Sequence, residues 1–311
     1  MSADTAETLV PNQKTGWMRC LVFLFLHLAC FSVYWVGWSW IAVGVAFVLY
    51  AVRAFALTGF YHRYFSHRAF KTSRWFQCVW AFIGCSAAQR GAIWWAAHHR
   101  DHHRFSDEER DVHSPRQHGF WWSHMLWFMT DENFKTKEQG VRDLLKLPEL
   151  KFIDNHDYIP PLALAASVYG LGAILEHYAP QLGTNGLQML VWGFLISTVF
   201  LYHVTYAINS LAHVWGSRRY ETTDDSRNNF LLALFAMGEG WHNNHHHYPA
   251  SARNGFFWWE IDVTYYTLVV FSWLGLVSDL KPVPAHVLAI NGDVELPTQV
   301  QVSDSGNKAT I

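Results

Sequence analysis

Three short stretches of the chain carry histidines at spacings that could build a metal site. Two of them place histidines at positions i, i+3 and i+4, so that in a helix the three side chains project from one face: His99, His102 and His103, and His242, His245 and His246. A third stretch holds the pair His62 and His67. Because histidine is the commonest metal ligand, we expect the three stretches to close around one metal centre.

The spacing within each triplet suggests more than one metal ion. The two later histidines diverge by roughly 100° about the helix axis, given 3.6 residues per turn, so one triplet could reach two adjacent metals. Two such triplets facing each other make a dinuclear centre plausible. Ligation by ring nitrogens alone is compatible with Fe, Cu, Zn or Ni, and the ligand type does not choose among them.

The pair His62 and His67 sets a geometric condition. A five-residue step turns the side chain of an ideal helix by about 140°. The pair therefore faces one metal only if the helix unwinds here or if the site lies at its tip. Asn209 and His213 are a further candidate pair, at i and i+4 near the end of an apolar segment, and by themselves they are a weak signal.

The composition indicates a membrane protein. Of 311 residues, 51% are hydrophobic and 15% are charged, whereas soluble domains carry about 25% charged residues. The 23 basic and 25 acidic residues nearly cancel, so the bulk charge does not suggest binding to nucleic acid. The cysteines lie in apolar segments without zinc or redox spacing, and we interpret them as core or lipid-facing thiols: Cys20, Cys30, Cys78 and Cys85.

Four apolar segments approach the length of about 20 residues that a spanning helix needs: roughly 18–38, 40–60, 160–178 and 187–213. The predicted fold is an all-α integral membrane protein, with four transmembrane helices in two hairpins and a helical cytosolic cap that holds a histidine-rich di-metal site. The membrane-bound domain covers 17–285, between an N-terminal tail at 1–16 and a polar tail at 286–311. We expect Trp75–Ala97 to form an interfacial or re-entrant helix, and Gly255–Val277 an amphipathic helix on the membrane surface or on the cap.

The distribution of basic residues predicts the orientation. Lysine and arginine are frequent between His62 and Pro160 and absent from the two short turns that connect the spans. By the positive-inside rule, both turns face away from the cytosol. Four spans then place both tails, all three histidine clusters and the active site on the cytosolic side.

Taken together, the clusters resemble the three histidine boxes of membrane-bound fatty acid desaturases, in particular the Δ9 (stearoyl-CoA desaturase-like) group in its bacterial form. The stretches that carry the resemblance are His62-Arg63-Tyr64-Phe65-Ser66-His67, His99-Arg100-Asp101-His102-His103 and Glu239-Gly240-Trp241-His242-Asn243-Asn244-His245-His246. Asn209 to His213 is similar to the extra ligand motif that precedes the third box. The resemblance covers roughly His62 to Leu280.

The resemblance implies a non-haem di-iron enzyme that uses O₂ and two electrons to introduce a cis double bond, at Δ9, into a saturated acyl chain. It also implies the ligands: one iron would take His62, His67, His99, His103 and His245, and the other His102, His213, His242 and His246, with Asn209 holding a water on one iron. The implied partners are a fatty acyl substrate carried by CoA or by a lipid, the membrane lipid, and a separate electron donor such as ferredoxin, a cytochrome b5-like protein or a reductase. The chain has no cysteine set for an iron–sulfur cluster of its own.

Other residues near the clusters are expected to have ordinary roles. We interpret several histidines as bystanders of the metal centre: His98, His247, His113, His118, His124 and His156. Asp107, Glu108 and Glu109 are interpreted as solvated loop charge, and Arg63, Arg68, Lys71 and Arg74 as positive charge at the cytosolic face. Glu239 and Asp101 are candidates to accept the N–H of a ligating ring, although Asp101 could point away. Trp94 and Trp95 are expected to pack at the interface or in the core.

Two alternatives stay open on the residues alone. An acyl hydroxylase or acetylenase would use the same scaffold, because C–H abstraction is common to all three reactions. A non-enzymatic, histidine-rich membrane protein that binds or transports metal is the other. Transporters bind near the bilayer midplane, whereas these histidines lie outside the predicted spans, which favours the enzyme.

Overall fold

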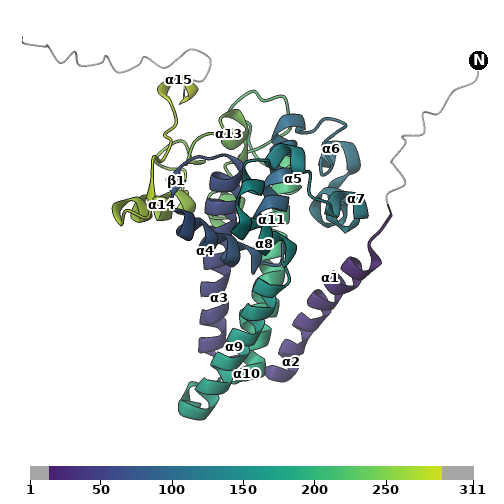
Figure 1. Ribbon diagram of the computed structural model, residues 1–311, viewed down its shortest axis with the longest axis vertical. Coiled ribbons are helices and arrows are strands. Elements are labelled where there is room, and N and C mark those ends of the chain that lie inside the picture. The colour runs from purple at the N-terminus through teal and green to yellow at the C-terminus, as the bar shows by residue number, and fades with distance from the viewer. Residues whose placement is uncertain (1–13, 289–311) are drawn as a thin grey trace, which may run out of the picture.

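The computed structural model describes residues 14–288, and four long apolar helices dominate it (Figure 1). They cover Trp17–Val36, Trp40–Ser66, Ile159–Tyr178 and Gly186–His213, and each is long and apolar enough to cross a membrane. The prediction of an all-α membrane protein with four such helices is confirmed. The second helix continues to Ser66 rather than ending near residue 60, because it passes into a π-helix that carries the first histidine pair.

Each long helix is built from shorter regular segments. The first contains α1 (Trp17–Ala29), η1 (Cys30–Ser32) and α2 (Val33–Val36), and the second contains α3 (Trp40–Phe55) and η2 (Ala56–Ser66). The third is α9 (Ile159–Tyr178), and η7 (Pro180–Leu182) connects it to the fourth, which contains α10 (Gly186–Met189), η8 (Leu190–Ile196), α11 (Ser197–Asn209) and η9 (Leu211–His213). Both α1 and α3 pack against η8, so the fourth helix lies between the first two.

Local signals in the sequence set the ends of these helices. Gly37, with φ of 66°, makes the turn between the first two helices in the left-handed region that favours glycine. The side chain of Ser39 then accepts a hydrogen bond from the backbone N–H of Ala42 and caps α3. Asn185 caps α10 in the same way. The first turn of α9 contains Pro160 and Pro161, where no intrahelical N–H bond is lost.

Residues 67–158 and 214–288 form a cap at one end of the four helices (Figure 1). Its first part contains β1 (Lys71–Thr72), α4 (Arg74–Cys85), α5 (Ala92–Phe105), α6 (Pro115–His118), η3 (Trp122–Leu126), η4 (Trp127–Met129), α7 (Asp131–Phe134), η5 (Glu138–Val141), η6 (Leu144–Lys146) and α8 (Pro148–Asn155). Its second part contains α12 (Phe230–Phe235), α13 (His242–His247), α14 (Val263–Trp273), β2 (Val277–Ser278) and α15 (Ala285–Leu288). Antiparallel pairing of β1 with β2 joins the two parts.

Two helices that we predicted at the membrane interface or on the cap are shorter than expected. The segment Trp75–Ala97 is divided between α4 and α5, because Ala88 and Arg90 adopt positive φ angles of 55° and 70° in the connection. The segment Gly255–Val277 is helical only over α14. The side chain of Asp262 accepts from the backbone N–H of Tyr265 and caps α14, so this carboxylate is buried at the helix start instead of lying on an exposed polar face.

An aromatic core fixes η2, the carrier of the first histidine pair, against the cap. The ring of Phe60 stacks on Trp80 of α4 with centroids 5.1 Å apart, and Phe55 contacts the edge of Phe271 of α14 at 5.4 Å. Such pairs add about 0.5–1.5 kcal/mol each beyond the area they bury. The end of the second long helix is thereby held rigidly where its histidines are needed.

Candidate metal centre

A π-helix meets the geometric condition on the first histidine pair. In η2 the backbone bonds run from residue i+5 to residue i, and the N–H of His67 donates to the carbonyl of His62 at 3.2 Å. The wider turn brings residues five apart onto one face, so the two rings lie with centroids 4.9 Å apart. His62 and His67 therefore face one site from a continuous helix.

Helices α5 and α13 divide their triplets between two groups of histidines. The candidate ligand atoms in each group lie within 4.8 Å of one another. The first group contains His62, His67, His99, His103 and His245, and the second contains His102, His213, His242 and His246. The two groups have the same members as the two ligand sets that the resemblance implies, and metal binding by them remains a prediction.

Within each group, the Nε2 atoms point at one another. The close Nε2–Nε2 pairs are His62–His245 at 2.9 Å, His103–His245 at 2.9 Å, His67–His99 at 2.8 Å and His213–His242 at 3.0 Å. Because a neutral imidazole has a single N–H, facing nitrogens of this kind are best satisfied by a shared cation. The buried Nε2 of His246 also has no hydrogen-bond partner among the described residues. A donor set of imidazole nitrogens fits a first-row transition metal, iron included.

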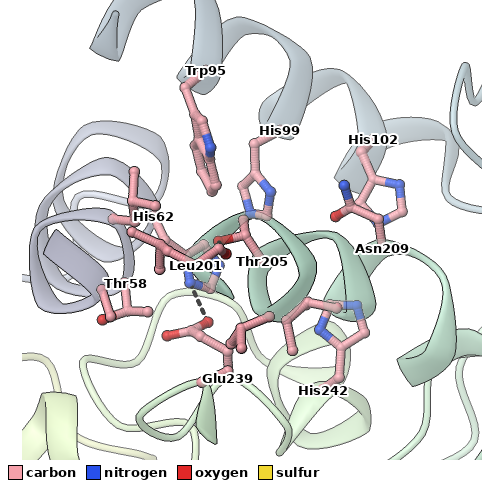
Figure 2. Close-up of a pocket in the computed structure, with 15 residues that line it drawn as sticks. Thr58, His62, Trp95, His99, His102, Leu201, Thr205, Asn209, Glu239 and His242 are labelled. Atoms are coloured by element: carbon pink, nitrogen blue, oxygen red, sulfur yellow. Dashed lines mark hydrogen bonds and ion pairs between the residues drawn. The ribbon is translucent and has the colours of Figure 1, made fainter. Parts of the chain in front are cut away.

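Buried carboxylates lie against the opposite ring nitrogen of four of these histidines. The Nδ1–carboxylate distances are 2.5 Å for His62–Glu239, 2.9 Å for His102–Asp111, 2.8 Å for His213–Asp107 and 2.6 Å for His246–Asp224. A carboxylate at this position keeps the ring proton on Nδ1 and leaves the Nε2 lone pair free for a metal. Figure 2 shows the first of these pairs, with the ring of His62 directed at Glu239.

The electrostatics of the site favour ionised carboxylates and, at His99, His103 and His245, neutral rings. Burial by itself raises the pKa of Asp224, but hydrogen bonds and the charge of His246 hold it well below its ordinary range. Burial likewise raises the pKa of Asp107 and Asp111, but the interactions with His213 and His102, respectively, outweigh it and lower both pKa values. Burial and mutual repulsion lower the pKa of the rings in the first group that lie in the cap, which keeps them in the neutral form that binds metal: His99, His103 and His245.

The prediction that Asp107 is solvated loop charge was wrong. The residue is 2% exposed, and its carboxylate accepts hydrogen bonds from His213 and Ser114. Glu108 and Glu109 are exposed, as predicted. Sequence reasoning also missed Asp111 and Asp224, since their distance along the chain from the histidines they contact conceals the pairing. The only signal in the sequence was that both residues are carboxylates, the residue type that commonly accepts a hydrogen bond from a metal-binding histidine.

The two predicted acceptors behave differently. Glu239 reaches His62, whereas Asp101 points away from both groups and pairs with Lys137 at 2.5 Å. The prediction that Arg63 is surface charge was wrong, because this residue is 1% exposed and lies 3.0 Å from both Glu239 and Asp262. Arg68, Lys71 and Arg74 are exposed, each beside a carboxylate.

The remaining histidines lie outside the two groups. His247 stacks on Tyr220 with centroids 4.1 Å apart, and the Nε2 of buried His98 lies 3.2 Å from the carbonyl of Lys135. His113 is not the ordinary polar residue we expected, because it is buried against Asp111 with its ring centroid 4.4 Å from that of His102. Three others form a hydrogen-bonded series that ends at Ser210, and these are His27, His203 and His124.

Two cavities meet at the histidine groups. An outer cavity of about 690 Å³ extends from α1 and α9 to His99 and Asn209. An inner cavity continues from there to Thr58 and Glu239. Four residues line both, and these are Trp95, His99, Thr205 and Asn209. Trp94 and Trp95, expected to pack at the interface or in the core, also line these cavities, and Figure 2 shows the side chain of Trp95 among those that line the inner one.

Sequence comparisons with known proteins identify the family. The sequence model of the family "Fatty acid desaturase" matches residues 38–269. The chain is 41% identical over 248 residues to a palmitoyl-monogalactosyldiacylglycerol delta-7 desaturase of Arabidopsis thaliana, covering 78% of this chain and 63% of that longer protein. It is 36% identical to delta-9 acyl-lipid desaturase 1 of the same plant, over 90% of this chain and 91% of the relative. It is 37% identical to an acyl-CoA 5-desaturase of Anemone leveillei, over 84% of this chain and 78% of the relative.

These matches cover most of the chain, including all three histidine clusters and the helices that position them. The chain therefore belongs to the fatty acid desaturase family and is an oxidoreductase that desaturates fatty acyl chains.

Proposed function

We propose that the chain binds two iron ions and uses O₂ and two electrons to place a cis double bond at the Δ9 position of a saturated acyl chain. The observation that carries this proposal is the convergence of nine imidazole rings into two groups, each with its candidate ligand nitrogens close together, and with carboxylates behind four of the rings. One iron is held by the first group and the other by the second, with Asn209 placing a water beside one of them. When bound, the iron pair would activate O₂, the oxidant that is needed to remove hydrogen from an unactivated methylene group.

The chain itself supplies binding, orientation and exclusion of water. An acyl chain lies along the outer cavity, passes the shared residues Trp95 and Thr205, and ends in the inner cavity, which is lined at its far side by apolar residues such as Ala54 and Leu57. The methylenes beside His99 and Asn209 are then the ones that approach the metals. Fixed geometry of this kind selects which carbons react. The Δ9 position follows from the resemblance and from one of the relatives, whereas the other two relatives act at positions 7 and 5.

The two electrons come from a separate protein, such as ferredoxin, a cytochrome b5-like protein or a reductase. Two observations support this partner. The family resemblance implies a separate electron donor, and the cysteines in the described part of the chain do not form a set that could hold an iron–sulfur cluster. The active site faces the cytosol, an orientation supported by the basic residues of the cap. The predicted tails, 1–16 and 286–311, lie mostly outside the described residues.

Product analysis tests the function directly. Expression in a host auxotrophic for unsaturated fatty acids should restore growth, and gas chromatography with double-bond location should find Δ9 monounsaturated chains. Hydroxylated chains without alkenes would instead establish the hydroxylase alternative. Purified active protein should contain about two irons per chain by metal analysis. Less than one iron per chain would favour the metal-binding alternative.

A further inference from the structure

The two histidine groups differ in the carboxylates that support their rings. In the second group, three of the four rings contact a buried aspartate at 2.6 to 2.9 Å, and the pairs are His102–Asp111, His213–Asp107 and His246–Asp224. In the first group, His62 is the only one of five rings that contacts a carboxylate among the described residues, and Figure 2 shows this carboxylate, Glu239, beside it. The support is therefore concentrated on the group with fewer rings.

The three aspartates of the second group are held as anions by hydrogen-bond donors. Each accepts from hydroxyl or backbone N–H groups besides its histidine, and these donors belong to Ser114 and Asp225 at Asp107, to Asp107 and His113 at Asp111, and to Ser226 at Asp224. Donors of this kind favour the charged form of a carboxylate. No lysine or arginine in the described part of the chain forms an ion pair with any of the three.

The arginines on this side of the centre are engaged elsewhere. Arg116 and Arg218 both pair with Asp225. Their side chains are 44% and 34% exposed, so solvent screens much of their charge. The side of the second group therefore carries four carboxylates against two partly solvated guanidinium groups, and the excess charge is negative.

Behind the first group, a buried cation offsets the carboxylate. The side chain of Arg63 is 1% exposed and lies 3.0 Å from both Glu239 and Asp262. A guanidinium group is protonated at every pH that proteins tolerate. The negative charge that reaches the ring of His62 through Glu239 is thus reduced by a positive charge in direct contact with the same carboxylate.

A second cluster of charges near the first group adds no excess of negative charge. Arg100 follows the ligand candidate His99 on α5, and its guanidinium donates to the carbonyl of Ser66 at 3.1 Å, one residue before His67. Arg100 and Arg68 both pair with Asp143. With Arg63 and its two partners included, three guanidinium groups face three carboxylates on this side, and the charges cancel.

We propose that the two groups bind metal unequally, so that the second group takes the first divalent ion and holds it more tightly, and the first group takes the second ion and releases it first. A carboxylate behind a ligating histidine changes metal affinity by about 10- to 100-fold, and the second group has two more of them. The extra ring of the first group offsets part of this gain. We expect the two dissociation constants to differ by at least about tenfold. This inference rests on the proposed function and adds an order of loading to it.

Metal titration of the full-length apoprotein tests the order without any turnover. Co²⁺ is the probe, because its visible absorption reports binding and it does not oxidise during the titration. Titration against a competing chelator should give two dissociation constants that differ by about tenfold or more. X-ray absorption at one Co²⁺ per chain should find four imidazole ligands per ion. Five imidazole ligands at this loading would place the first ion in the first group and overturn the proposal.

Two ligand variants isolate the groups. His99→Ala leaves only the second group complete, and His242→Ala leaves only the first. The first variant should keep the tighter constant and the second variant the weaker one. The opposite assignment would overturn the proposal, and the wild-type absorption measurement decides the question if either variant does not fold.

Two carboxylate variants test the physical cause. Asp111→Asn should weaken the tighter constant by about 10- to 100-fold and leave the weaker one unchanged, because its ring belongs to the second group. Glu239→Gln is the matched change in the first group and should weaken only the weaker constant. A loss of the same constant in both variants would contradict the assignment of carboxylates to separate ions.

Failure of this inference is distinguishable from failure of the proposed function. Two ions bound with equal constants would overturn the unequal binding and leave the di-metal centre in place. Less than one Co²⁺ bound per chain at saturation would contradict the order of loading and the di-metal centre together.

Discussion

At the scale of single residues, the candidate centre depends on pairs of a histidine and a carboxylate. Each pair fixes one ring nitrogen and aims the other at a shared point. Three of the four pairs belong to the second group, where Asp107, Asp111 and Asp224 are buried and ionised. The second group is therefore the more strongly oriented of the two.

Loss of a predicted histidine ligand should abolish turnover, whereas loss of an adjacent histidine outside the two groups should not. His246→Ala and His102→Ala should each remove all measurable product while the protein remains inserted in the membrane, because each removes a nitrogen from the second group. His247→Ala is the matched control, since this ring stacks on Tyr220 outside both groups and should keep most of the activity. Product is measured by gas chromatography of cell lipids. Retained turnover in both ligand variants would show that these positions do not bind the metal.

The carboxylates should control metal affinity. Asp224→Asn should weaken iron binding by about 10- to 100-fold, the usual effect of losing a group that orients a ligating histidine. Asp225→Asn is its neighbour and control, because the side chain of Asp225 pairs with Arg116 and contacts no member of either group. Iron retained per chain after dialysis against a graded chelator series measures the difference. Equal retention by the two variants would exclude the orienting role of Asp224.

At the scale of secondary-structure elements, α1 is the least firmly held of the long helices. It has no buried residue, and its polar attachments are Arg19–Asp131 at the cap end and a 3.1 Å contact between Nε2 of His27 and Nε2 of His203 farther along. Hydrogen bonds between membrane helices contribute about 0.6 kcal/mol on average. Since α1 also walls the outer cavity, its attachment bears on access of the acyl chain.

Removal of the His27–His203 contact should loosen α1. His27→Ala should speed amide hydrogen exchange in Trp17–Val36 by about threefold, the equivalent of 0.6 kcal/mol, and leave exchange in α9 unchanged. His177→Ala is the control, because His177 lies at the far end of α9 and its ring contacts Tyr178. Hydrogen–deuterium exchange with mass spectrometry in nanodiscs resolves the two segments. Identical exchange in α1 of both variants would show that this contact does not hold the helix.

At the scale of the whole molecule, the two histidine groups lie at the cap end of the four long helices, where Figure 1 shows α5 and α13, which carry both triplets. The apolar faces of those helices are exposed, as with Trp35 at 82% and Tyr178 at 79%, which suits contact with lipid. The cap holds most of the basic residues, whereas the turns at the opposite end have none. This asymmetry predicts that the cap is cytosolic.

Single cysteines report the orientation. In a background without the four native cysteines, Gln181→Cys in the exposed turn after α9 should react with an impermeant maleimide added outside intact cells. Glu108→Cys, on the exposed surface of the cap, should react only after permeabilisation. Both positions are exposed, so the comparison isolates sidedness. Labelling of Glu108→Cys in intact cells would reverse the orientation.

The sequence by itself determined the four membrane helices and the family, and short spacings indicated that each histidine triplet shares one face of a helix, because an α-helix has 3.6 residues per turn. The division of the histidines between two metals came from the family resemblance, and metal binding by the two groups stays a prediction. The sequence did not determine how His62 and His67 meet, because a π-helix and an α-helix are not distinguished by such a pattern.

Only the tertiary structure revealed the carboxylates behind the rings. Asp107 was predicted to be solvated loop charge and Asp224 was not singled out, because their burial depends on contacts with His213 and His246, which lie more than twenty residues away along the chain. The same is true of Arg63, whose burial is compensated by Glu239 and Asp262. A charged side chain can be buried at low cost only when folding brings its distant partners into contact with it. Its burial is therefore a property of the folded chain and not of any one segment.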